Sequence, residues 1–118
     1  MGSMPMPRSQ TPQSGILPGT LDLLVLKTLS RGPLHGYGIA QHLHQTTSSF
    51  LNVGEGTLYP ALQRLVVNGW AEAEWKMSET GRRARYYTIT AAGRKHLKDQ
   101  EREFERMINA IRLVLRTV

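Results

Sequence analysis

The side chains with the most obvious capacity for chemistry in this sequence are four histidines: His35, His42, His44 and His96. The chain has no cysteine, so thiolate metal sites are excluded. His42 and His44 are two residues apart, and a helix therefore places them on different faces. No carboxylate accompanies them as a further ligand. We expect no metal site and no cofactor.

Hydrolytic chemistry has equally little support. Ser30, Ser48 and Ser49 are the candidate nucleophiles, but neither a nucleophile elbow nor a glycine-rich phosphate loop surrounds them. We therefore expect that the protein is not an enzyme.

Positive charge is the stronger signal, because it is concentrated in one segment. The chain has 118 residues and a formal net charge of +6. Basic and acidic side chains cancel within residues 1–75 and again within residues 99–118. The segment 76–98 holds Lys76, Arg82, Arg83, Arg85, Arg94, Lys95 and Lys98 against a single acidic residue, Glu79. Such a local excess is typical of a surface for a polyanion, although a solvated, solubilising face has the same composition.

Three short helices are predicted ahead of this basic segment. Apolar residues recur at helical spacing over residues 20–30, 36–46 and 54–68. In the first of these helices Leu23 and Leu26 lie outside the main apolar stripe. That position predicts a second buried surface, against another subunit. Three short helices with tight connections predict a helix-turn-helix bundle.

A β-hairpin is predicted to carry the basic side chains. The alternation of apolar and polar residues changes to a period of two over residues 70–77 and again over 85–90, with Gly81 in the turn. The inner face of the first strand is predicted to hold Ala71, Ala73, Trp75 and Met77. The hairpin would therefore have a basic tip.

A long helix is predicted over residues 91–117, starting from the N-cap candidate Thr90. At about 1.5 Å per residue it is roughly 40 Å long, which is more than a small core can cover. We therefore expect a homodimer. Its predicted interface consists of Leu23, Leu26, Leu97, Phe104, Ile108, Ile111 and Leu115.

These elements predict a mainly α chain with a small β-hairpin (α+β): a winged helix-turn-helix over residues 16–90 and a dimerisation helix over 91–118. Residues 1–15 are rich in Pro, Ser, Gln and Gly and are predicted to be a disordered arm that begins with a cloning remnant. No apolar run is long enough to span a bilayer. We expect a cytoplasmic protein without membrane contact.

Three stretches also resemble a known family. LHGYGIAQHL, GEGTLYPALQRLVVNGW and TGRRARYYTITAAG are similar to the signature stretches of the PadR family of bacterial transcriptional regulators. The resemblance covers roughly residues 16–118, and it implies a homodimeric winged-helix repressor of the short subfamily with a single terminal helix. Gly54 and Glu55 depart from the Ser-Pro-like helix start of many members, which puts a phosphate contact there in doubt. Ala84 interrupts the basic run of the hairpin.

DNA contacts are expected from the third helix and from the start of the second. Arg pairs with guanine and Gln with adenine in bidentate fashion, and Thr and Tyr suit phosphate or thymine. The candidates on the third helix are Thr57, Tyr59, Gln63 and Arg64. Tyr37 resembles a family position that contacts phosphate. The alternatives are that the two tyrosines pack against the core and that Arg64 is solvated.

The hairpin is expected to contact the DNA backbone or a narrow minor groove. Lys76, Arg82, Arg83 and Arg85 are its candidate side chains, because guanidinium groups match phosphate geometry. The alternative is that Arg83 or Arg85 pairs with Glu72 or Glu74.

The start of the third helix is unusual for a stable helix. Small residues at Gly54 and Gly56 would let its backbone approach phosphate closely, with free amides presented to it. Pro60 removes one helical hydrogen bond and would bend the helix there. Glu55 favours the helix dipole but would repel phosphate.

The expected function is transcriptional regulation, as a repressor that binds a palindromic operator. Some members of the resembled family admit flat, apolar effectors at the dimer interface, so Phe104 and Met107 are candidate effector contacts, with a dry interface as the alternative. A winged-helix protein-interaction module without specific DNA binding, or more remotely a ligand-sequestering protein, would have similar elements.

Overall fold

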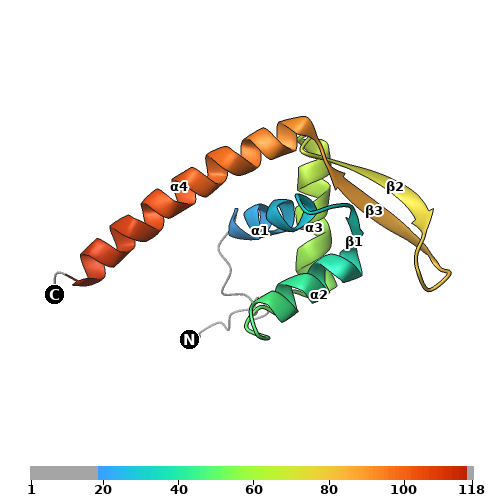
Figure 1. The fold of residues 1–118 in the computed structure, drawn as a ribbon, viewed down its shortest axis with the longest axis horizontal. Helices are drawn as coiled ribbons and strands as arrows, with labels where there is room; N and C mark the ends of the chain where they lie inside the picture. The colour runs from blue at the N-terminus through green and yellow to red at the C-terminus, as the bar shows by residue number, and fades with distance from the viewer. Residues whose placement is uncertain (1–18, 117–118) are drawn as a thin grey trace, which may run out of the picture.

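The computed structural model describes residues 19–116, so the predicted arm over residues 1–15 lies outside the described residues. In chain order the elements are α1 (Thr20–Leu29), β1 (Leu34–His35), α2 (Gly36–Thr46), α3 (Glu55–Val67), β2 (Ala71–Met77), β3 (Arg83–Ile89) and α4 (Ala91–Arg116). The predicted class, a mainly α chain with a small β-hairpin in a winged helix-turn-helix, is confirmed. Helices α1 to α3 form a compact head, from which the hairpin and α4 project on opposite sides (Figure 1).

Helix α1 lies at the centre of the head. It contacts α2, α3, α4 and β3, so its side chains are covered on more than one side by this chain alone. Leu26 is 1% exposed and Leu23 is also buried. The predicted second subunit is therefore not needed to explain the apolar breadth of α1, because the head itself covers these side chains.

The sheet has a strand that the sequence analysis missed. β1 pairs with β3, placing Leu34 opposite Tyr87, and the strand order is β1-β3-β2. Two residues are too few for an alternating pattern to be recognised. Because His35 of β1 also caps α2, this short strand connects the sheet to the second helix.

Only the base of the hairpin belongs to the core. Ala71, Tyr87 and Ile89 are buried, whereas Trp75 is 55% exposed and Met77 is also exposed. The predicted inner face therefore continues onto a part of the hairpin that the head does not cover. The outer half of β2 and β3 projects into solvent as a wing (Figure 1).

Helix α4 is attached to the head through its first part. The Thr90 hydroxyl donates to the Gly69 carbonyl at 2.7 Å and accepts from the Gly93 amide at 2.9 Å, which caps the helix as predicted. A Cβ at Gly93 would collide with the Trp70 carbonyl oxygen, so glycine permits this close approach. The His96 ring stacks on the Trp70 indole with a centroid separation of 3.6 Å.

Beyond this attachment α4 leaves the head. Leu97 was predicted to lie in the dimer interface, but it is buried within the protomer and packs in the core. Lys27 and Glu101 form an ion pair of 2.9 Å between α1 and α4. From Arg102 onward the side chains are mostly exposed. No helix among residues 19–116 is long and apolar enough to cross a membrane.

Candidate nucleic-acid interface

The start of α2 is held against the sheet by His35. The Gly38 amide donates to His35 Nδ1 at 3.0 Å, and the His35 ring lies edge-on to Tyr86 with centroids 5.1 Å apart. Tyr37, in the first turn of α2, is 72% exposed. The cap therefore fixes the helix end that carries one of the predicted phosphate contacts.

Helix α3 divides into a buried and an outward stripe. Its buried side chains are Leu58, Ala61, Leu62 and Leu65. Gly56, Pro60, Gln63 and Val67 are all exposed, and their spacing of four, three and four places them together on the side opposite the core. This outward stripe is the side of α3 that the protein's own core leaves uncovered.

Tyr59 and Thr57 lie beside the outward stripe. Tyr59 leans toward α2, since a Cβ placed on Gly36 would be 3.2 Å from its ring, yet the side chain is half exposed. Thr57 is exposed. Both side chains remain accessible to a ligand at the head.

Arg64 was predicted to contact a base or to be solvated, but it pairs with an acidic side chain of α1. Its Nε donates to Asp22 Oδ2 at 3.1 Å and its Nη2 to Asp22 Oδ1 at 2.8 Å, a bidentate pair between α3 and α1. The hydrogen bonds that Arg64 donates to Asp22 raise the pKa of the Arg64 guanidinium above its ordinary value. The two residues are 42 positions apart, and no local sequence pattern predicts their pairing.

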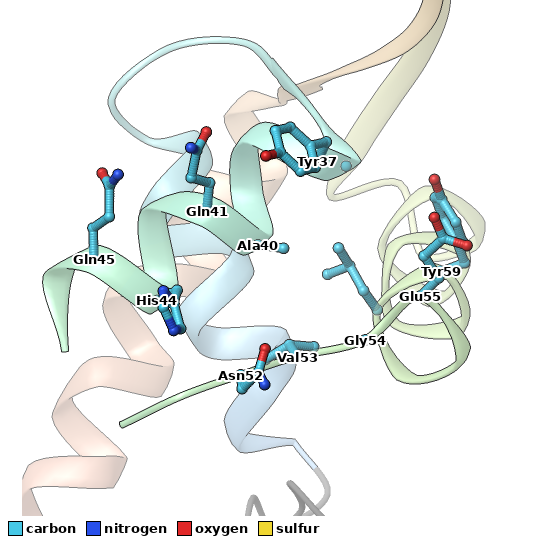
Figure 2. A pocket seen from close by; sticks show the side chains of 12 residues that line it. Tyr37, Ala40, Gln41, His44, Gln45, Asn52, Val53, Gly54, Glu55 and Tyr59 are labelled. Atoms are coloured by element: carbon cyan, nitrogen blue, oxygen red, sulfur yellow. The ribbon is translucent and has the colours of Figure 1, made fainter. Parts of the chain in front are cut away.

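A cavity of about 400 Å³ lies between α2 and the start of α3. Figure 2 shows Tyr37 and Tyr59 on opposite sides of this cavity, with Glu55 beside Tyr59. Glu55 is exposed and forms no ion pair among residues 19–116. This carboxylate is therefore unneutralised at the edge of the candidate interface.

The wing presents arginines around an aromatic ring. Trp75 is directly opposite Arg85 in the β2–β3 register. The guanidinium carbons of Arg83 and Arg85 lie 5.2 and 5.9 Å from the centre of the Trp75 ring. These separations are within cation–π range.

The other face of the wing carries a different set of charges. Lys76 lies 4.8 Å from the centre of the Tyr86 ring. Glu72 and Glu74 alternate with Trp75 along β2 and so face away from Arg83 and Arg85. No ion pair joins either glutamate to a wing arginine in the described part of the chain, so the alternative pairing is not formed.

A cleft of about 880 Å³ brings the predicted residues of two regions together. Its lining includes Tyr37 of α2, Tyr59 of α3, and Arg82, Arg83 and Arg85 of the wing. Thr57, Gln63, Arg64 and Lys76 are outside this lining. The head and the wing thus share one concave surface whose cations come from the wing.

Two other basic residues, at the start of α4, contact groups of the same protomer. Arg94 lies 3.5 Å from the Ser30 carbonyl oxygen, and Lys95 pairs with Asp99 at 3.6 Å. Within residues 19–116, no group of histidines and carboxylates is arranged to hold a metal ion.

A three-helix head with an arginine-bearing wing defines a winged-helix DNA-binding protein. Residues 25–99 match the sequence model of the family described as "Transcriptional regulator PadR-like family". The chain belongs to this family and is a transcriptional regulator.

Relatives support the same assignment over most of the chain. A transcriptional regulator of Mycobacterium tuberculosis is 32% identical over 89 residues, which cover 75% of this chain and 79% of that protein. The solved structure of a transcriptional regulator from Clostridium thermocellum has a TM-score of 0.76 and 32% identity, covering 84% of this chain and 96% of that one.

A third relative is named for its regulatory direction. The "Negative transcriptional regulator PadR" of Bacillus subtilis is 27% identical over 79 residues. The match covers 67% of this chain but only 43% of that protein.

Proposed function

We propose that this regulator is a homodimeric repressor that binds a palindromic operator, with α3 of each protomer in the major groove and each wing along the backbone or minor groove. The main support is the cleft in which Arg82, Arg83 and Arg85 stand beside Tyr37 and Tyr59. Guanidinium and phenol groups on one concave surface suit a phosphate backbone.

The distribution of charge supports the same orientation. Within α2 and α3 the formally charged side chains are Glu55 and Arg64, and Arg64 is held by Asp22. The positive charge that lines the cleft therefore comes from the wing. Most of the electrostatic affinity for DNA would arise there, and α3 would contribute contacts to bases.

Dimerisation is proposed from the apolar side chains on α4. Phe104, Met107, Ile111 and Leu115 are exposed in the protomer, and Ile108 is half-buried. A second α4 would cover them. A two-fold axis between the copies would present two α3 helices to half-sites about 34 Å apart, and a palindrome is the matching DNA symmetry.

Repression and effector release are further parts of the proposal. The B. subtilis relative is named a negative regulator, which favours repression. A flat, apolar effector between the α4 helices, at Phe104 and Met107, would change the angle between the two heads. Because both heads must fit the DNA at once, such a change would release the operator.

The test removes the charge of the wing. We expect Arg82→Ala/Arg83→Ala/Arg85→Ala to weaken binding to the DNA upstream of the protein's own gene. The log–log salt slope should become shallower by about 0.9 for each lost phosphate contact, or roughly three in total. Fluorescence anisotropy at several salt concentrations measures both quantities.

A matched variant removes the same charge elsewhere. Arg102→Ala/Arg106→Ala/Arg112→Ala lies on exposed parts of α4 and should leave the salt slope unchanged, with sedimentation confirming the same oligomer. Unchanged affinity and slope in the wing variant would contradict DNA binding and favour a protein-interaction module.

A further inference from the structure

The outward stripe of α3 is unusually poor in hydrogen-bonding groups. Its members are Gly56, Pro60, Gln63 and Val67, and only Gln63 has a polar side chain. Val67 is 73% exposed. A groove-reading surface with this composition can make one bidentate hydrogen bond and otherwise apolar contacts.

The side chain best suited to guanine is occupied elsewhere. Arginine reads guanine through paired donors to its O6 and N7 acceptors. Two donor atoms of the Arg64 guanidinium, Nε and Nη2, are directed at Asp22, at 3.1 and 2.8 Å. Release would leave the Asp22 carboxylate without its partner, so the pair opposes a change of role.

The unpaired charge at the start of α3 also disfavours guanine. Glu55 carries a carboxylate without an ion-pair partner in the described chain. A carboxylate repels the O6 and N7 acceptors of guanine and accepts only from the amino groups of adenine and cytosine. Glu55 lies in the first turn of α3, where a negative charge is favourable for the helix dipole, so this residue has no cost in stability.

Thymine and adenine offer the complementary groups. Thymine presents a C5 methyl in the major groove, which packs on apolar side chains, and adenine presents N6 and N7 to the amide of Gln. The Pro60 ring is exposed and rigid, so its contact with a methyl group loses little conformational entropy. Gly56, one turn earlier, has no side chain to hold the helix away from the bases.

We propose that α3 selects A·T pairs in each half-site: Pro60 packs on a thymine methyl, and Gln63 pairs with an adjacent adenine. This inference rests on the proposed function, because it needs α3 in the major groove. It adds the class of base pair that the helix reads and the two side chains that read it.

The first test identifies the sequence that the protein prefers. Selection from a random-sequence duplex library should give half-sites whose α3-contacted positions are A·T pairs. Selection with Gln63→Ala should relax the preference at one adenine and leave the remainder of the half-site unchanged. Conserved G·C pairs at the Gln63-dependent position would overturn the inference while DNA binding itself stands.

The second test removes single methyl groups from the selected operator. Replacing one thymine by deoxyuridine deletes only the C5 methyl, so a contacted position should lose about four-fold in affinity, the factor for burying one such group. Pro60→Ala is expected to fold, because Pro60 is exposed and alanine is the better helix former. In this variant the same replacement should have a clearly smaller effect. Equal losses in the two proteins, or no loss at any thymine, would overturn the methyl contact.

Two further variants separate this inference from the proposed function. The wing variant Arg82→Ala/Arg83→Ala/Arg85→Ala should weaken the thymine and deoxyuridine operators by the same factor. Asp22→Asn frees Arg64 and should increase tolerance of guanine beside the half-site; unchanged tolerance would contradict the role given to the pair. Failure to select any DNA would overturn the proposed function together with this inference.

Discussion

At the scale of single residues, the glycines at the start of α3 can be tested for whether the fold requires them or only a ligand would. A Cβ added at Gly54 or Gly56 meets nothing within 4 Å, and the φ of Gly54 is −85°. Neither position therefore requires glycine for the protein's own packing. Gly93 is the opposite case, because a Cβ there collides with the Trp70 carbonyl oxygen. The close approach of a ligand explains the small residues of α3 better than the protein's own packing does.

Gly56→Ala is expected to have opposite effects on stability and binding. Alanine is the better helix former by up to about 1 kcal/mol, so thermal unfolding should occur at the same or a higher temperature. Operator affinity, measured by anisotropy, should fall because the methyl group holds the helix away from DNA. Gly93→Ala serves as the contrast and should lower the unfolding temperature. Full operator affinity in a folded Gly56→Ala would contradict a close approach at this position.

At the scale of elements, the wing depends on an exposed aromatic side chain for its geometry. The core covers only the base of β2 and β3, so Trp75 contributes little to the buried interior. Its ring lies within cation–π range of both Arg83 and Arg85. We infer that the indole restricts two long side chains that would otherwise lose more freedom on binding phosphate.

Trp75→Leu is expected to weaken operator binding without unfolding the wing. Leucine keeps the apolar bulk but removes the π face, and two exposed cation–π contacts contribute about 0.5–1 kcal/mol each. Affinity should therefore fall several-fold, with little change in the unfolding temperature. Trp75→Phe, which keeps an aromatic ring, should retain most of the affinity. If leucine binds the operator as well as tryptophan does, the indole has no such positioning role.

At the scale of the whole molecule, α4 is longer than the head can cover. Its first part is capped by Thr90 and joined to α1 by the Lys27–Glu101 pair, and the remainder leaves the head with apolar side chains exposed (Figure 1). Exposed apolar surface of this kind is typical of an interface. The proposed palindrome, the spacing of the half-sites and any effector response all depend on a second copy at this helix.

Ile111→Glu is expected to dissociate the proposed dimer, because it places a charge within the apolar stripe. Sedimentation at micromolar concentration should show a monomer, and affinity for a full palindrome should drop toward that for one half-site. Leu113→Glu is the matched control, since Leu113 is exposed two residues away on the opposite side of the helix. A wild-type protein that sediments as a monomer would refute the dimer.

Local patterns were sufficient for most of the elements. The helical spacing in α1 to α4, the alternation in β2 and β3, and the Thr90 cap each depend on residues close together in the chain, and the structure confirms them within a few residues. The charge of the wing was equally visible, because charge is a property of composition. The strand β1 was missed because two residues contain no periodicity.

The sequence by itself determined the class of the fold, the basic wing and the family, because those follow from short-range periodicity and local motifs. Tertiary structure alone decided that Leu23, Leu26 and Leu97 are internal, that Asp22 holds Arg64, and that the exposed Trp75 ring lies within cation–π range of two arginines. The physical reason is that each of these outcomes depends on which surfaces meet. Distant segments meet in the head through packing, and the two strands of the wing meet through their register, and neither is encoded in a local pattern.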